Sequence, residues 1–276
     1  MRKLVLSDHT QDQANAAAGK RQADFERAYA EYEAAISNRS SHEKSLANKS
    51  QQHWQERRYF SWLLSYFPRL LHAFASRPKA PSKAAAGREE IVWNAGGEGE
   101  QRVIDALSTK LSDEWVAISG YKNPGGEIDL LLVGPDGVMA IEIKYVNGRV
   151  CCDEDRWWRD KSDKYGNVVE RNLPIADKKG RGPSAQVNAS ASRLQRFLAE
   201  RTPVTVVLRA VVLSHPQSSI GETLRQTVDD IATLDSFDPM GVFKRTVGTG
   251  HRLLVDDLVR IISQDHRYHE SRSKRQ

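Results

Sequence analysis

The chain has 276 residues, of which 39% are apolar and 28% charged, and its formal net charge is +5. No run of 18 apolar residues is present, which argues against an ordinary membrane-spanning helix, and the first residues lack the apolar stretch of a signal peptide. The only cysteines, Cys151 and Cys152, are adjacent and cannot staple a fold, which favours a cytoplasmic location.

The positive charge is concentrated in the first third of the chain. Residues 1–88 contain 15 Lys and Arg against 8 Asp and Glu, whereas the remainder contains 26 against 28. A basic segment beside a near-neutral body suits an anionic partner, either nucleic acid or a membrane surface. The alternative is a solvated helix face without a partner.

The basic segment predicts a helical arm over residues 1–75. Residues 8–50 contain no proline and read as a long polar helix, with a short aromatic and aliphatic stripe at Phe25, Tyr29, Tyr32 and Ile36. Residues 54–75 are crowded with aromatic and aliphatic side chains and predict a kinked helix that packs on its own domain or forms a homodimer; binding to a membrane surface is the less favoured reading. Residues 76–88 have the prolines and small residues of a linker.

A second domain is predicted over residues 89–263. It begins with a glycine-rich start of a helix, and two alternating apolar segments, 127–133 and 138–146, flank a Gly-Pro-Asp-Gly turn and predict a β-hairpin. The polar residues 147–183 predict a long loop.

Three more elements follow in this domain. Residues 184–200 have helical spacing, and residues 203–213 form the nearly continuous apolar run of a strand buried on both faces. A helix is expected near 255–263, and residues 264–276 are predicted to be a disordered tail.

The hairpin places two carboxylates opposite each other. If Gly134 and Gly137 close the turn, Asp129 faces Glu142 across the two strands, and Lys144 shares a face with Glu142. Like charges in this position destabilise a sheet unless something neutralises them, and a divalent cation such as Mg²⁺ or Mn²⁺ is a natural candidate. An ordinary ladder of ion pairs on the solvent face is the alternative.

Two further polar residues fall on apolar helix stripes. Glu100 lies three, four and seven residues before Val103, Ile104 and Leu107, so helical spacing turns it towards the core. A buried carboxylate is costly unless it is paired or bound to metal, although an acid near a helix N-terminus is also common. Gln186 lies at the border of the stripe of the 184–200 helix.

The order of these segments resembles the nuclease-related domain (NERD) of the PD-(D/E)XK nuclease superfamily. The segments that carry the resemblance are GGEGE, EIDLLLV, the Gly-Pro-Asp-Gly turn, AIEIK, a Trp-containing loop and the Pro-Ser-Ala-Gln start of a helix, over about residues 95–215. The segment before Gln186 reads GRGPSAQ rather than the Asn-Pro sequence common in the family.

The resemblance implies an α/β fold, with a restriction-endonuclease-like α-β-β-β-α-β core and a mixed central sheet that follows the α-helical N-terminal arm. It also implies Mg²⁺-dependent phosphodiester hydrolysis. Carried over position by position, the catalytic residues would be Glu100, Asp129, Glu142, Lys144 and Gln186, with Asp129, Glu142 and Glu100 at the metal.

The sequence therefore predicts a metal-dependent nuclease that acts on DNA in preference to RNA. Lys178, Lys179 and Arg181, in a basic stretch before the 184–200 helix, are expected to bind nucleic acid. The alternatives are a catalytically silent nucleic-acid-binding or scaffold protein with a nuclease-like core, and a membrane-surface regulator that acts through residues 54–75. A role in bacterial defence or DNA maintenance follows only by analogy.

Overall fold

The computed structural model describes every residue except 8, 66, 69–76, 84, 247–252 and 274–276. The chain divides into two compact units. Met1–Asp12 and Val92–Gln276 form the first, and Gln13–Ile91 forms the second.

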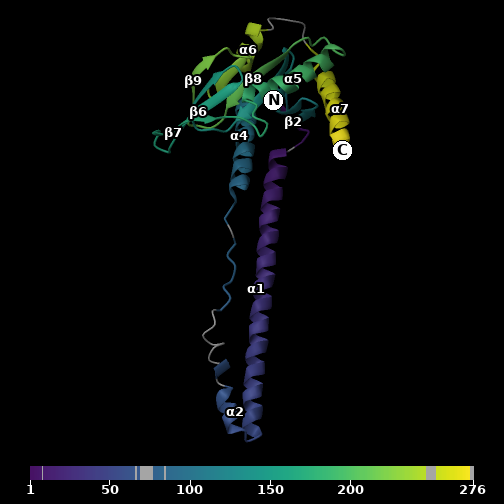
Figure 1. Ribbon diagram of the computed structural model, residues 1–276. Helices are drawn as coiled ribbons and strands as arrows, with labels where there is room; N and C mark the ends of the chain where they lie inside the picture. Colours follow the sequence, from purple (N-terminus) through teal and green to yellow (C-terminus); the bar gives the residue numbers. More distant parts are fainter. Residues whose placement is uncertain (8, 66, 69–76, 84, 247–252, 274–276) are drawn as a thin grey trace. The chain divides into compact units, whose positions relative to one another are not determined.

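A six-stranded mixed sheet forms the centre of the first unit (Figure 1). Its strands, in spatial order, are β1 (Arg2–Val5), β2 (Val116–Asn123), β3 (Gly126–Gly134), β4 (Gly137–Lys144), β8 (Val207–Leu213) and β10 (Asp230–Thr233). The pairs β2–β3 and β3–β4 are antiparallel, whereas β1–β2, β4–β8 and β8–β10 are parallel. This confirms the expected mixed α/β fold with a mixed sheet.

Helices bury both faces of this sheet. The inward stripe of α5 (Pro183–Ala199) joins one hydrophobic cluster, to which α7 (Val255–Ser273) adds Leu258 and Ile262. The other cluster holds the apolar stripe of α4 (Arg88–Lys110) together with side chains from α6 (Pro239–Thr246). Residues 130–133 of β3 alternate between the two clusters, as the period of two requires, whereas Ile128 joins the same cluster as Leu131 and Val133.

The predicted hairpin is confirmed, including its register. Gly134 pairs with Gly137 and Leu130 pairs with Ile141, which is the alignment that the four-residue turn dictates. Gly137 adopts a φ of +151°, and an added Cβ would lie 2.7 Å from Cε1 of Phe243. Both observations explain why glycine closes this turn.

The prediction of a long loop over residues 147–183 was wrong for most of that segment. A second, four-stranded sheet contains β5 (Gly148–Asp153), β6 (Arg156–Ser162) and β7 (Val168–Pro174), with β9 (Ser218–Leu224) at its other edge. Only a few of its side chains are buried, among them Val150, Cys152 and Trp157. These strands are held together mainly by backbone hydrogen bonds, and most of their side chains face solvent. Their sequences therefore lack the alternation of apolar and polar residues that would have predicted strands.

Three boundaries also differ from the expectation. Arg2–Val5 forms an edge strand of the central sheet, whereas the sequence suggested only a helical arm there. The glycine-rich segment lies inside α4 rather than at its start. At Gly99 an added Cβ would lie 2.7 Å from Ser214 Oγ and 3.0 Å from Tyr145 Cβ, so close packing accounts for a glycine at this helical position. The predicted disordered tail begins inside α7, which extends to Ser273.

The second unit contains the long helix predicted near the N-terminus. Helix α1 (His9–Gln55) ends close to Arg57, whose φ of +56° is incompatible with a right-handed helix, and α2 (Tyr59–Leu64) follows. Residues 69–75 of the predicted kinked helix lie outside the described residues. Among the helices that the structure describes, none is long and apolar enough to span a bilayer.

Candidate active site

The two carboxylates predicted from the hairpin lie side by side. The ladder between β3 and β4 ends at the pair Leu130–Ile141, and at the next position the backbone N–H of Ile143 donates to Asp129 Oδ2 at 2.8 Å. Because Ile141 and Ile143 point into the cluster that contains α4, Glu142 points to the opposite face, on which α5 packs, and Asp129 lines the same pocket as Glu142. Glu142 is buried, with 3% of its surface exposed.

Lys144 connects these carboxylates to α5. Its ammonium group lies 2.5 Å from Glu142 Oε1 and donates to Gln186 Oε1 at 3.2 Å. The amide nitrogen of Gln186 in turn donates to the carbonyl oxygen of Arg181 at 2.8 Å. Gln186 is in the first turn of α5, so the Pro-Ser-Ala-Gln start of this helix brings its side chain to the end of β4.

Burial and charge act in opposite directions on these groups. Burial, reinforced by the charge of Asp129, raises the pKa of Glu142 to about 8 despite the nearby Lys144. Burial also raises the pKa of Asp129, although Lys144 and the Ile143 N–H oppose the rise. The pKa of Lys144 is lowered by burial but raised overall, because Glu142 and Asp129 stabilise its charged form. Two buried acids thus share one lysine, and charge on both would leave negative charge uncompensated.

A pocket of about 200 Å³ opens over this cluster. It is lined by Ser7, Trp93, Glu100, Gly126, Glu127, Asp129, Glu142, Arg181, Gln186 and Ser190. Four of the five residues predicted to be catalytic therefore share one pocket, and the fifth, Lys144, contacts two of them. Their catalytic roles remain predictions.

The three basic residues predicted to bind nucleic acid separate into two groups. Arg181 lines the pocket, and its guanidinium lies 2.8 Å from Asp177 Oδ2. Lys178 and Lys179 are exposed and do not line the pocket. Asp177 caps this turn by accepting from the backbone N–H groups of Lys179 and Arg181.

Two carboxylates of the pocket, Asp129 and Glu142, suit a hard divalent cation, but no larger set of ligands surrounds them among the residues that the structure describes. In the described parts of the chain, no three or more His, Cys, Asp or Glu side chains form a group that could hold a metal, so Glu100 does not complete a ready-made triad with Asp129 and Glu142. Those two carboxylates alone still match Mg²⁺, which commonly takes one or two carboxylates and fills its other positions with water and substrate phosphate.

Five lining residues were not among the predicted site residues: Ser7, Trp93, Gly126, Glu127 and Ser190. Trp93 lies seven positions before Glu100 on α4, so helical spacing could have placed both on one face. Ser7 follows β1, and its hydroxyl donates to the carbonyl oxygen of Gly120 at 2.7 Å. An added Cβ at Gly120 would lie 1.9 Å from the Ser7 carbonyl oxygen, so Ser7 is positioned by a residue far away in the sequence. The residues around Ser7 therefore contain no pattern that would have predicted its place at the pocket.

A mixed α/β fold with paired carboxylates, a lysine and a glutamine around one pocket is consistent with a nuclease-like domain. Residues 95–214 match the family model described as the nuclease-related domain, NERD. This match agrees with the resemblance that the sequence motifs indicated. No curated protein and no solved structure matched the chain.

Proposed function

We propose that this protein is a metal-dependent nuclease that hydrolyses phosphodiester bonds, with DNA as its substrate. The observation that carries the proposal is the contact of Lys144 with both Glu142 and Gln186, which line one pocket together with Asp129. A buried like-charge pair is costly to maintain, and strongly perturbed acids in a cleft are frequent at functional sites.

The order of elements supports the same proposal. Helix α4, strands β2, β3 and β4, helix α5 and strand β8 follow one another in the chain, and β5, β6 and β7 are inserted between β4 and α5. This order supports an α-β-β-β-α-β core of the kind that the resemblance to the PD-(D/E)XK superfamily implies.

Each residue then has a distinct role. Asp129 and Glu142 would hold Mg²⁺ or Mn²⁺, with Glu100 at the same pocket as an outer partner. The bound ion would supply a water of lowered pKa and would neutralise phosphate charge. Lys144 would orient the attacking water and stabilise charge that develops on the phosphoryl oxygens. Gln186 holds the Lys144 side chain in place through its 3.2 Å hydrogen bond.

The proposal also covers the binding partners of the protein and its cellular location. Arg181 lies at the pocket and would contact a phosphate of the bound strand, with the exposed Lys178 and Lys179 beside it. Two free cysteines suit the reducing cytoplasm, and the exposed side chains of α2 would support a homodimer. Bacterial defence or DNA maintenance would be its setting.

Cleavage of plasmid DNA by the purified full-length protein tests the proposal. Cleavage should require Mg²⁺ or Mn²⁺, stop in EDTA and be lost in Asp129→Asn. The matched control is Asp235→Asn, which changes an exposed aspartate outside the pocket. An RNA of the same sequence, assayed in parallel, tests the preference for DNA.

Two outcomes would contradict the proposal. Nucleic-acid binding without any cleavage, equal in wild type and Asp129→Asn, would identify a silent binding protein. Binding to anionic vesicles without either property would identify a membrane-surface regulator.

A further inference from the structure

One side of helix α5 leads away from the candidate active site. Gln186, Ser190, Arg193 and Phe197 follow at intervals of four, three and four residues and therefore lie along one side of the helix. Gln186 and Ser190 line the pocket of the active site, whereas Arg193 and Phe197 line a second pocket of about 200 Å³. The two pockets are therefore consecutive along a single helix.

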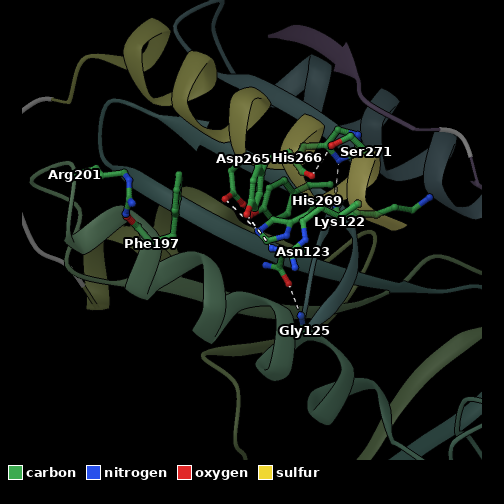
Figure 2. Close-up of polar contacts among 12 residues, drawn as sticks. Lys122, Asn123, Gly125, Phe197, Arg201, Asp265, His266, His269 and Ser271 are labelled. Atoms are coloured by element: carbon green, nitrogen blue, oxygen red, sulfur yellow. Dashed lines mark hydrogen bonds and ion pairs between the residues drawn. The ribbon is translucent and has the colours of Figure 1, made fainter. Parts of the chain in front are cut away.

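The turn between β2 and β3 lies between these pockets and is fixed to α5. Asn123 donates to the carbonyl oxygen of Ser190 at 2.9 Å. The N–H of Gly125 donates to Asn123 Oδ1 at 2.8 Å (Figure 2). Asn123 lines the second pocket and Gly126 the first. An added Cβ at Gly125 would lie 2.4 Å from the carbonyl oxygen of Ala189, so glycine allows this close approach. The turn is a fixed divider rather than a loose loop.

The floor of the second pocket is a buried polar cluster that is already satisfied. Tyr121 donates to Asp265 Oδ2 at 2.5 Å. His269 Nε2 lies 3.4 Å from Asp265 Oδ1 (Figure 2). Burial and the neighbouring Asp265 raise the pKa of Tyr121, which keeps its hydroxyl protonated as a donor. Both oxygens of Asp265 are thus engaged by groups other than the arginines of this pocket.

Three arginines surround this floor, and two of them have no counter-charge. Arg201 lies 2.7 Å from Glu200 Oε2, and its guanidinium lies 4.3 Å from the centre of the Phe197 ring. Arg193 and Arg196 are exposed and make no ion pair or hydrogen bond with any residue that the structure describes. Two guanidinium groups that line one pocket from positions three residues apart on a helix, both free to donate, suit the binding of phosphate.

We infer that Arg193 and Arg196 bind the backbone phosphates of a nucleic-acid strand whose cleaved bond lies in the neighbouring pocket. This inference rests on the proposed nuclease function and assigns the path of the substrate. From the active site the strand passes over the Asn123–Gly126 turn, beside Ser190, whose buried hydroxyl has no hydrogen-bond partner among the described residues.

The length of the helix fixes the spacing of this contact. Arg193 and Arg196 follow Gln186 by seven and ten residues, which is about 10–15 Å at the helical rise. Phosphates of one strand of B-DNA advance about 3.4 Å per step along the axis. The arginines therefore reach phosphates about three to four base-pair steps from the bond that is cut.

A salt titration of DNA binding tests the contact. Full-length protein is mixed with a short labelled duplex in EDTA, which prevents cleavage, and the affinity is measured over a series of salt concentrations. Arg193→Gln/Arg196→Gln should weaken binding about tenfold and reduce the slope of log affinity against log salt by about two, because each lysine or arginine on a phosphate contributes about one. Lys244→Gln/Arg267→Gln removes the same charge from exposed positions outside this pocket and should leave the slope unchanged.

A chemically modified substrate tests the position. The modified duplex carries one uncharged methylphosphonate about three to four steps from the cut. The wild type should cleave it more slowly than the unmodified duplex. The double arginine variant should cleave both duplexes at the same rate, because the methylphosphonate and the arginine substitutions remove the same contact. Additive losses, or an unchanged salt slope in a double variant that still cleaves DNA, would overturn the inference and leave the nuclease function intact. A wild type that cleaves no nucleic acid would instead overturn the proposed function.

Discussion

The ammonium nitrogen of Lys144 lies 2.5 Å from Glu142 Oε1, although burial raises the pKa of that carboxyl to about 8. At neutral pH Glu142 therefore holds a proton for much of the time, and its ionised form depends on Lys144. The same lysine offsets Asp129, and the charge of Arg181 adds a weaker effect on Glu142, so Lys144 is the main cation that balances the two carboxylates.

Replacement of Lys144 should abolish cleavage and destabilise the protein in a pH-dependent way. At about pH 9 Glu142 is ionised, and Lys144→Met would leave a buried charge unpaired, at a cost of about 3–5 kcal/mol. At about pH 6 Glu142 is protonated and the loss should be smaller. Urea unfolding of wild type and variant in EDTA measures both values. A variant that cleaves DNA normally would contradict the role given to Lys144.

The raised pKa of Glu142 also predicts how stability depends on pH. A glutamate ionises near pH 4.5 in the unfolded chain but near pH 8 in the folded protein. The contribution of Glu142 to stability is therefore complete below about pH 4.5 and is lost as the pH rises towards 8. In EDTA, Glu142→Gln should flatten this part of the stability profile. Glu222→Gln, which changes an exposed glutamate, should follow the wild type.

A divalent cation should bind only when both carboxylates are present. Titration calorimetry with Mn²⁺ should show one site in the wild type, with affinity that rises up to about pH 8, because binding competes with the proton on Glu142. Asp129→Asn and Glu142→Gln should each lose it. If Asp129→Asn binds Mn²⁺ as tightly as the wild type, the ion is held elsewhere.

Truncation to alanine should destabilise the protein much more at a buried position of β8 than at the exposed position just before it. Leu208 is fully buried, and Leu208→Ala should cost about 2–5 kcal/mol of unfolding free energy. Val206, just before the strand, is 43% exposed, and Val206→Ala should stay within about 0.5 kcal/mol of the wild type. Chemical denaturation of both variants provides the comparison, and equal losses would contradict the described packing.

Large apolar side chains near the end of α1 and along α2 should promote self-association. Trp54 contacts Tyr59 and Trp62, yet Phe60 is 78% exposed and Leu63 is 57% exposed. We expect a dimer in light scattering that becomes a monomer in Phe60→Ser/Leu63→Ser. A monomeric wild type would exclude this interface, and vesicle flotation that depends on these residues would assign them to a membrane surface.

The sequence predicted the hairpin and the stripe of α5 because both follow from local geometry. The Gly-Pro-Asp-Gly turn and the period of two determine which residues of β3 and β4 face each other. The period of 3.6 likewise identifies Val187, Ala191, Leu194 and Leu198 as buried, and all four are fully buried. Asp129, Glu142, Lys144 and Gln186 lie on these elements, which is why their proximity could be predicted.

The elements that were missed depend on distant partners. Strand β7 is almost entirely exposed and is held by its ladder to β6, so its side chains carry little pattern. The second half of α7 looked too polar for an ordered helix, yet buried Asp265 and His266 bond to Tyr121 and to the backbone of Lys122. Polar residues that are satisfied by tertiary contacts cannot be told apart from solvated ones in a sequence alone.

The pairing of β1 with β2 has a consequence for the order in which the protein folds. Arg2 is aligned with Val116, so the first strand of the sheet finds its partner only after the whole helical unit has been synthesised. Closing so long a segment carries an entropic cost, and contacts of this kind form late. A nascent chain released before β2 would leave β1 as an unpaired strand, and Ser7 would have no Gly120 carbonyl to accept its hydrogen bond.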